Sequence, residues 1–150
     1  MGYEHTYRPV QHTNRNGHTF TMTRDGWGNP LTITLPRGIQ WNFSYNYPAT
    51  YPVDPIISLT VSQVGHDGRV RTPTIYEFSQ QTNLAQGAIK GLLARVRSPR
   101  PGTVGAGQYV DTEFYYTPLG NVAVISAPGA NNDGRRWTTV FFYTVDPWGG

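Results

Sequence analysis

The chain has 150 residues and a net charge of +3, with 14% charged residues and 13% aromatic residues. Its 17 glycines and 12 prolines supply many turns, and it contains no cysteine. This composition excludes a disulfide framework, a thiolate site, a charged helical bundle and a disordered chain. It predicts an all-β protein, either an antiparallel β-sandwich of the jelly-roll type or a small β-barrel, with about eight strands.

Residues 1–18 are polar and have no sustained periodicity, which predicts an extended N-terminal arm. Its three histidines, His5, His12 and His18, are separated by seven and six residues. No known metal motif has that spacing, so we expect no metal site. The arm has no apolar signal segment, and no run in the chain approaches the ~18 apolar residues of a membrane span. We therefore expect a protein that is made in the cytoplasm and has no membrane span.

The segment Ile39–Tyr47 alternates aromatic or aliphatic residues with small polar ones, which is typical of a half-buried β-strand. The preceding segment Leu31–Leu35 alternates in the same way, after a short first strand at 19–23. A three-residue loop at 36–38 makes a hairpin in which every apolar residue faces an apolar residue. The predicted pairs are Leu35 with Ile39, Ile33 with Trp41 and Leu31 with Phe43. We therefore expect this face of the hairpin to lie in the core.

Three prolines make the next segment, 48–55, an irregular connection that carries Tyr51. Tyr45 and Tyr47 lie beyond the paired part of the hairpin. This tyrosine end is the part of the strand that we expect to meet a partner. Two further strands follow around a turn at 65–68, and they are predicted at Ile57–Val64 and Arg69–Phe78.

The segment 83–96 supports two interpretations. A helix is favoured by apolar residues at every fourth position and by the capping-box pattern of Asn83 with Gln86, although two glycines weaken it. The alternative is an edge strand that points Arg95 and Arg97 outward. We favour the helix, so the sequence predicts at most one short helix.

A loop rich in glycine and proline follows at 98–107, and its length predicts that it becomes ordered on a partner. We expect a three-stranded meander after it, over residues 108–117, 121–126 and 136–145. The last of these strands is apolar on both faces, which predicts that both faces are covered. Residues 147–150 form a C-terminal tail whose Trp148 we expect to dock. The predicted organisation is an arm at 1–18, one β domain at 19–146 and this tail.

Asp111 and Glu113 lie two residues apart on one predicted strand, flanked on the same face by Tyr109 and Tyr115. We interpret this face first as a solvated surface or a subunit contact that pairs with arginines. The candidate arginine partners are Arg135 and Arg136. Two other interpretations are a sugar-binding platform and a pair of catalytic carboxylates, as in glycoside hydrolysis.

No other pattern indicates chemistry. The chain has no Gly-x-Ser-x-Gly elbow and no phosphate-binding glycine loop, so we expect a protein that is not an enzyme and has no cofactor. The aromatic side chains of Trp41, Phe43 and Tyr45 could stack on bases. However, the arginines are dispersed and the net charge is small, which argues against nucleic acid as a partner.

In general character the chain resembles the small β-rich accessory proteins of bacteriophage particles, such as head decoration or cement proteins and tail components. The shared features are a β-rich chain without cysteine, with polar ends, loops of glycine and proline and no active-site motif. The resemblance implies a non-enzymatic virion protein that forms a symmetric homo-oligomer and binds a larger protein lattice. The alternative is a carbohydrate-binding module. The candidate interface or ligand residues are Tyr45, Tyr47, Tyr51, Tyr109, Asp111, Glu113, Tyr115, Arg135, Arg136 and Trp148.

Overall fold

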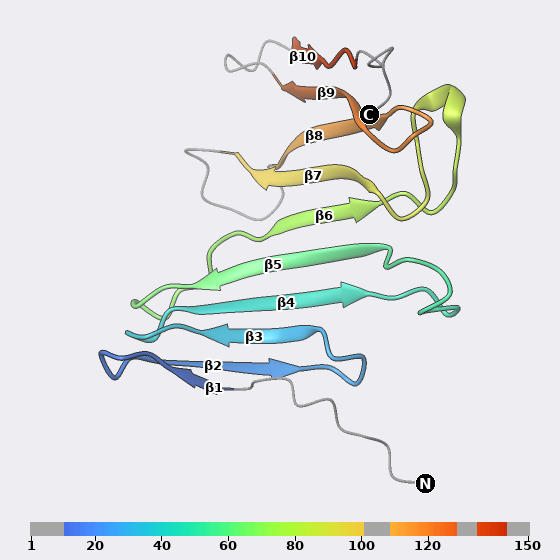
Figure 1. The fold of residues 1–150 in the computed structure, drawn as a ribbon. Coiled ribbons are helices and arrows are strands. Elements are labelled where there is room, and N and C mark those ends of the chain that lie inside the picture. Colours follow the sequence, from blue (N-terminus) through green and yellow to red (C-terminus); the bar gives the residue numbers. More distant parts are fainter. Residues whose placement is uncertain (1–10, 101–108, 129–134, 144–150) are drawn as a thin grey trace, which may run out of the picture. The chain divides into compact units, whose positions relative to one another are not determined.

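The structure is a computed structural model that describes residues 11–100, 109–128 and 135–143 (Figure 1). These residues form ten β-strands and one 3-10 turn, η1 (Leu84–Gln86). The strands are β1 (Gln11–Thr13), β2 (Thr19–Arg24), β3 (Pro30–Thr34), β4 (Gln40–Asn46), β5 (Ser58–Val64), β6 (Thr74–Phe78), β7 (Leu93–Pro99), β8 (Tyr109–Tyr116), β9 (Val122–Pro128) and β10 (Arg136–Val140). They are antiparallel and follow one another in the sheet in chain order, which confirms the predicted all-β class. Within the described ranges, no helix is long and apolar enough to cross a membrane.

The chain divides into two compact units, residues 1–44 with 60–73 and residues 45–59 with 74–150. The first unit contains β1 to β3 and most of β4 and β5, and the second contains β6 to β10. The single β domain at 19–146 stays a prediction.

The first unit confirms the predicted hairpin. Strands β3 and β4 pair with Ile33 opposite Trp41, and the loop closes with a hydrogen bond of 2.8 Å from the Leu35 N–H to the Ile39 carbonyl. Residues 11–18 do not form part of an extended arm. Instead, β1 pairs with β2, because the segment between them is another tight loop.

The expectation that this hairpin face lies in a core is wrong. Leu31 and Trp41 are 37% and 36% exposed, and none of the described residues is fully buried. The reason is that strand pairing only collects apolar side chains on one face, whereas burial needs a second layer above them. In the described ranges, the strand pairs with extensive contacts are all neighbours in the sheet.

One loop type recurs at five of the connections. In each loop the first N–H donates to the carbonyl four residues later, and a glycine N–H donates back to the first carbonyl. That glycine has a positive φ, between 72° and 86°, as three-residue hairpin loops require. The loops are Asn14–His18, Asp25–Asn29, Leu35–Ile39, Gly65–Arg69 and Thr117–Asn121.

The favoured helix at 83–96 is wrong, and the alternative is correct in that a strand forms there. Only the 3-10 turn η1 forms, without a side-chain cap from Asn83, and β7 begins at Leu93. Gly87 and Gly91 have left-handed φ values of 64° and 84°, which a continuous helix cannot contain. Strand β7 lies between β6 and β8, so it is not the edge strand of that alternative.

The predicted meander of the second unit is confirmed as β8, β9 and β10, but two expectations about β10 are not confirmed. Every residue of β10 is exposed, so its faces are not covered by the described residues. The strand also ends at Val140 rather than at residue 145. Residue 145 lies outside the described ranges, as do residues 101–107 of the predicted loop.

The sheet of the second unit has two different faces. Side chains of directly paired residues share a face, so Glu113 of β8 lies beside Arg95 of β7, and Phe114 lies beside Ile125 of β9 on the other side. The register assigns an apolar set to the second face, which we call the apolar face. Its members are Tyr76, Val96, Phe114, Ile125 and Trp137.

Candidate functional site

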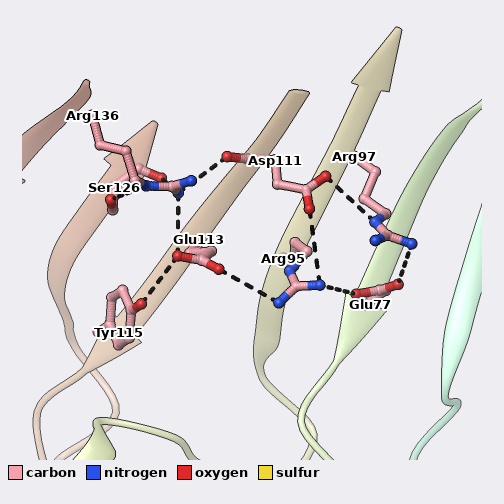
Figure 2. Close-up of polar contacts among 8 residues, drawn as sticks. All are labelled: Glu77, Arg95, Arg97, Asp111, Glu113, Tyr115, Ser126 and Arg136. Atoms are coloured by element: carbon pink, nitrogen blue, oxygen red, sulfur yellow. Dashed lines mark hydrogen bonds and ion pairs between the residues drawn. The ribbon is translucent and has the colours of Figure 1, made fainter. Parts of the chain in front are cut away.

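Opposite the apolar face, charged side chains form a row across the sheet of the second unit (Figure 2). We call this row the charged ladder. It contains three carboxylates and three guanidinium groups, so its formal charges cancel. Its members are Glu77 of β6, Arg95 and Arg97 of β7, Asp111 and Glu113 of β8, and Arg136 of β10.

Arg95 lies among all three carboxylates. Its Nη1 is 3.5 Å from Glu77 Oε2 and 3.9 Å from Asp111 Oδ2, and its Nη2 is 3.4 Å from Glu113 Oε1. Arg97 joins two of the same carboxylates, at 3.4 Å from both Glu77 Oε1 and Asp111 Oδ1. The two arginines of β7 therefore hold β6 and β8 together on this face.

Arg136 extends the ladder to the last strand. Its Nη2 donates to Glu113 Oε2 at 3.1 Å and to the Asp111 carbonyl at 3.1 Å. Its Nε donates to Ser126 Oγ at 2.8 Å, and Nη2 also reaches the Ser126 carbonyl at 2.8 Å. Arg136 thus spans from β10 across β9 to β8.

Tyr115 completes the contacts of Glu113, because its hydroxyl donates to Oε2 at 3.1 Å. The pKa of Tyr115 is raised, first by its removal from water and then by this hydrogen bond to a carboxylate. The tyrosine therefore stays a donor at neutral pH.

Every carboxylate of the ladder contacts at least two arginines, which limits what the site can do chemically. The ladder side chains are between 28% and 38% exposed, so solvent screens these ion pairs strongly. A general acid or nucleophile needs a carboxylate that is available to a substrate, and sugar recognition needs acceptors with unused lone pairs. The geometry instead matches the first interpretation of this face, a surface whose charges pair with one another.

A hollow of about 760 Å³ lies next to the ladder. Glu77, Arg95, Glu113 and Tyr115 are among the residues that line it, and the segment 85–89 forms part of its wall. Within the described ranges, no group of three or more histidine, cysteine or acidic side chains is arranged to hold a metal ion.

The segment with η1 packs tightly on β8. The Tyr116 N–H donates to the Gly87 carbonyl at 2.7 Å, and a Cβ on Gly87 would lie 3.1 Å from Tyr115 Cβ. The Tyr116 hydroxyl donates to the Leu93 carbonyl at 2.7 Å, and burial raises the pKa of this tyrosine.

The predicted tyrosine end forms a separate cluster. The rings of Tyr45 and Tyr47 stack at 5.6 Å with an interplanar angle of 17°, and Tyr51 lies 4.5 Å from Tyr47 at 49°. In the same connection Asp54 pairs with Lys90. Hydrogen bonds from Lys90 and then from Thr50 lower the pKa of Asp54.

The structure therefore divides the candidate residues. Asp111, Glu113, Tyr115 and Arg136 come together in the ladder, whereas Tyr45, Tyr47 and Tyr51 come together through contacts between their rings. Tyr109 is opposite Pro99 at the start of β8, and Arg135 is exposed just before β10. Trp148 lies outside the described residues.

Four members of the site were not among the predicted residues. They are Glu77, Arg95, Arg97 and Ser126. The alternation of Arg95 and Arg97 was a usable signal, because it places both guanidinium groups on one face of a strand. In the favoured helix, residues two positions apart would lie on different faces, so the alternation was not used.

No family model matches the chain, and neither a curated protein nor a solved structure matches it.

Proposed function

We propose that this chain is a non-enzymatic structural protein that acts by association, with the apolar face of the β6–β10 sheet covered by another protein surface. One observation carries this proposal. The register collects aromatic and aliphatic side chains on one face, yet none of the described residues is fully buried. On soluble proteins, a large contiguous apolar patch that stays exposed to solvent marks an interaction site.

The magnitude of the exposure at one position supports this inference. Trp137 is 70% exposed. A tryptophan side chain can bury up to about 250 Å², so roughly 170 Å² of Trp137 remains to be covered, worth about 4 kcal/mol at most. A partner that covers the whole face would gain several such contributions, less the cost of association.

The polar face supports a structural function in a different way. Each carboxylate of the ladder is already paired with arginines, so the ladder stabilises the order of the strands without needing a ligand. A sheet with one face of mutually paired charges and one apolar face that is only partly covered is suited to a layer in a larger assembly.

Association in a bacteriophage particle is the finer part of the proposal, and it rests on the general resemblance to virion accessory proteins. Its test is the identity of the neighbouring genes. Neighbours that encode capsid or tail proteins support a virion function, and a metabolic operon without them refutes it.

The central experiment is sedimentation velocity from micromolar to millimolar concentration, with isosteric variants of the apolar face. Val96 of β7 and Thr112 of β8 are direct partners on that face. Val96→Thr removes apolar contact and should weaken association about tenfold or more, whereas Thr112→Val should strengthen it. A wild-type chain that stays monomeric throughout, or an oligomer indifferent to both changes, would refute the proposal.

The carbohydrate alternative keeps one favourable observation, the cluster of Tyr45, Tyr47 and Tyr51, since aromatic rings are the usual platform for sugar faces. The stacking of Tyr45 on Tyr47 occupies part of that surface. A glycan array decides this alternative, because a signal lost in Tyr51→Ala supports it and a blank array refutes it.

A further inference from the structure

The outer edge of β10 ends the strand order, and no strand in the described ranges pairs with it. On the inner side, the Phe141 N–H donates to the Ala123 carbonyl at 2.8 Å, one residue beyond the last β10–β9 pair. Backbone groups of an antiparallel strand point alternately to its two sides. Thr139 therefore also bonds toward β9, and the N–H and C=O groups of Thr138 and Val140 point outward.

This edge lacks the features that usually protect an edge strand from pairing. Strand β10 contains no proline, and its register with β9 has no shift. Its one charged side chain, Arg136, bonds toward β8 rather than past the edge. Large apolar side chains on this strand and directly after it are exposed. Trp137 in β10 is 70% exposed, and Phe141 and Phe142, which follow it, are 41% and 90% exposed. At the other end of the order, the described residues of β1 are Gln11, His12 and Thr13, none of which has a large apolar side chain.

We propose that β10 pairs antiparallel with β10 of a second copy of this chain, about a two-fold axis at Thr139, so that two sheets continue into a dimer. This inference goes beyond the proposed function, because it adds a contact at the edge of the sheet and leaves the apolar face available to the partner proposed above. A closed two-fold pair is favoured over a head-to-tail pair of β10 with β1, because the described residues of β1 carry no large apolar side chain to match those of β10.

The sequence of this edge is complementary to itself in that register. Aromatic residues meet aromatic residues, and β-branched residues meet β-branched residues, which are the favourable cross-strand combinations. The guanidinium of Arg136 lies in the charged ladder, so its aliphatic stem is the part that meets an aromatic ring, and this contact is apolar. The pairs are Thr139 with Thr139, Thr138 with Val140, Trp137 with Phe141 and Arg136 with Phe142 of the other copy.

Charge selects the antiparallel orientation. A parallel, in-register pair would place Arg136 directly beside Arg136 of the other copy, which is destabilising. The antiparallel pair places these two arginines at opposite ends of the strand. The central threonine pair has precedents in this chain, since Thr13 and Thr19, and Thr23 and Thr32, contact through their hydroxyls at 2.9 and 2.7 Å.

Cysteine cross-linking tests the register directly, because the chain has no cysteine of its own. In the proposed dimer Thr139 opposes its own copy as a non-hydrogen-bonded pair, with Cα atoms about 4.5 Å apart, which a disulfide can span. Thr139→Cys should oxidise to a covalent dimer at least about tenfold faster than Leu119→Cys, which is 86% exposed on a loop and reports random collision. Thr138→Cys should cross-link as slowly as Leu119→Cys. In the proposed register Thr138 faces Val140 of the second copy, so the two cysteines would lie two positions apart along the paired strands.

The outcomes separate this inference from the proposed function. The dimer is supported if Thr139→Cys cross-links fast and Thr138→Cys does not. Fast cross-linking of Thr138→Cys instead overturns the register. If the wild-type chain associates but neither variant cross-links faster than Leu119→Cys, the edge pairing is overturned and the function stands; if the chain is monomeric, both are overturned.

A proline pair provides a second measurement. Thr138→Pro removes an N–H that points outward, so it should raise the dimer dissociation constant at least about tenfold while leaving the far-ultraviolet spectrum unchanged. Thr139→Pro removes an N–H that points to β9, so it should disturb the fold of the free chain as well. Unchanged dimerisation in Thr138→Pro would overturn the proposal.

Discussion

Replacing Arg95 by methionine tests whether the charged ladder stabilises the sheet. The guanidinium of Arg95 contacts Glu77, Asp111 and Glu113 at 3.5, 3.9 and 3.4 Å. Methionine keeps much of the length of the side chain and removes the charge, so the ladder loses three ion pairs. Three carboxylates then share the two remaining arginines, and the formal charge of the ladder falls to −1.

The expected cost follows from distance and exposure. Unit charges 3.4 Å apart interact by about 1 kcal/mol in water and more in a less polar surrounding. Arg95 is 36% exposed, so each pair should be discounted to between about 0.2 and 1 kcal/mol. We therefore expect Arg95→Met to lower the free energy of unfolding by about 1–2 kcal/mol, which corresponds to roughly 3–6 °C in the melting temperature.

The assay is denaturant unfolding at low and at high salt. The loss should shrink at high salt, because the ladder is partly exposed and counter-ions screen it. A double-mutant cycle with Glu113→Gln isolates one pair, for which we expect a coupling of about 0.3–1 kcal/mol. Arg69→Met is the matched control, since Arg69 is 82% exposed and meets Asp67 only at 4.0 Å. It should change stability by less than about 0.5 kcal/mol.

Two results would refute this reasoning. If Arg95→Met and Arg69→Met behave alike and the cycle shows no coupling, the ladder does not stabilise the sheet. A loss above about 4 kcal/mol would mean instead that the pairs are buried in the associated protein.

Two further predictions concern the packing of η1 and the state of a tyrosine. Gly87→Ala should cost about 2–3 kcal/mol, because its φ is 64° and the new Cβ would lie 3.1 Å from Tyr115, whereas Gly120→Ala (φ 85°, nearest atom 4.0 Å) should cost only about 1 kcal/mol in the same denaturation assay. Equal costs would contradict the close packing on β8. Tyr116→Phe should lose about 0.5–1.5 kcal/mol at neutral pH with its hydrogen bond to β7. Burial raises the pKa of Tyr116 above its ordinary value of 10.0, so its contribution is complete below pH 10 and is lost as the pH rises through the folded pKa. The difference between wild type and variant should therefore narrow in unfolding measured well above pH 10, and a constant difference would refute this assignment.

Much of the fold was predictable because its signals are local. Alternation with period two identifies a strand and assigns its faces, and a glycine at the end of a short polar segment identifies a hairpin loop. The pair Ile33–Trp41 follows from these two signals together and is confirmed. The recurrence of one loop type was available in the same way from Gly17, Gly28, Gly38, Gly68 and Gly120.

The failures at 83–96 and at the core have a different origin. The fourfold spacing of apolar residues around Gly87 fits a helix and a half-exposed strand equally well, and the left-handed glycines decide against the helix. The register of β3 and β4 correctly places Leu31 and Trp41 on one face, but a register contains no information about a second layer.

The all-β class, the hairpin register and the face shared by Asp111 and Glu113 follow from the sequence. These properties depend on residues a few positions apart. Only the tertiary structure decided that Arg95 meets Glu113, 18 residues away, and that Arg136 crosses β9 to the same carboxylate, 23 residues away. Such contacts depend on the order of strands in the sheet. Local periodicity does not encode that order, since any of the alternating strands presents the same pleat to its neighbour.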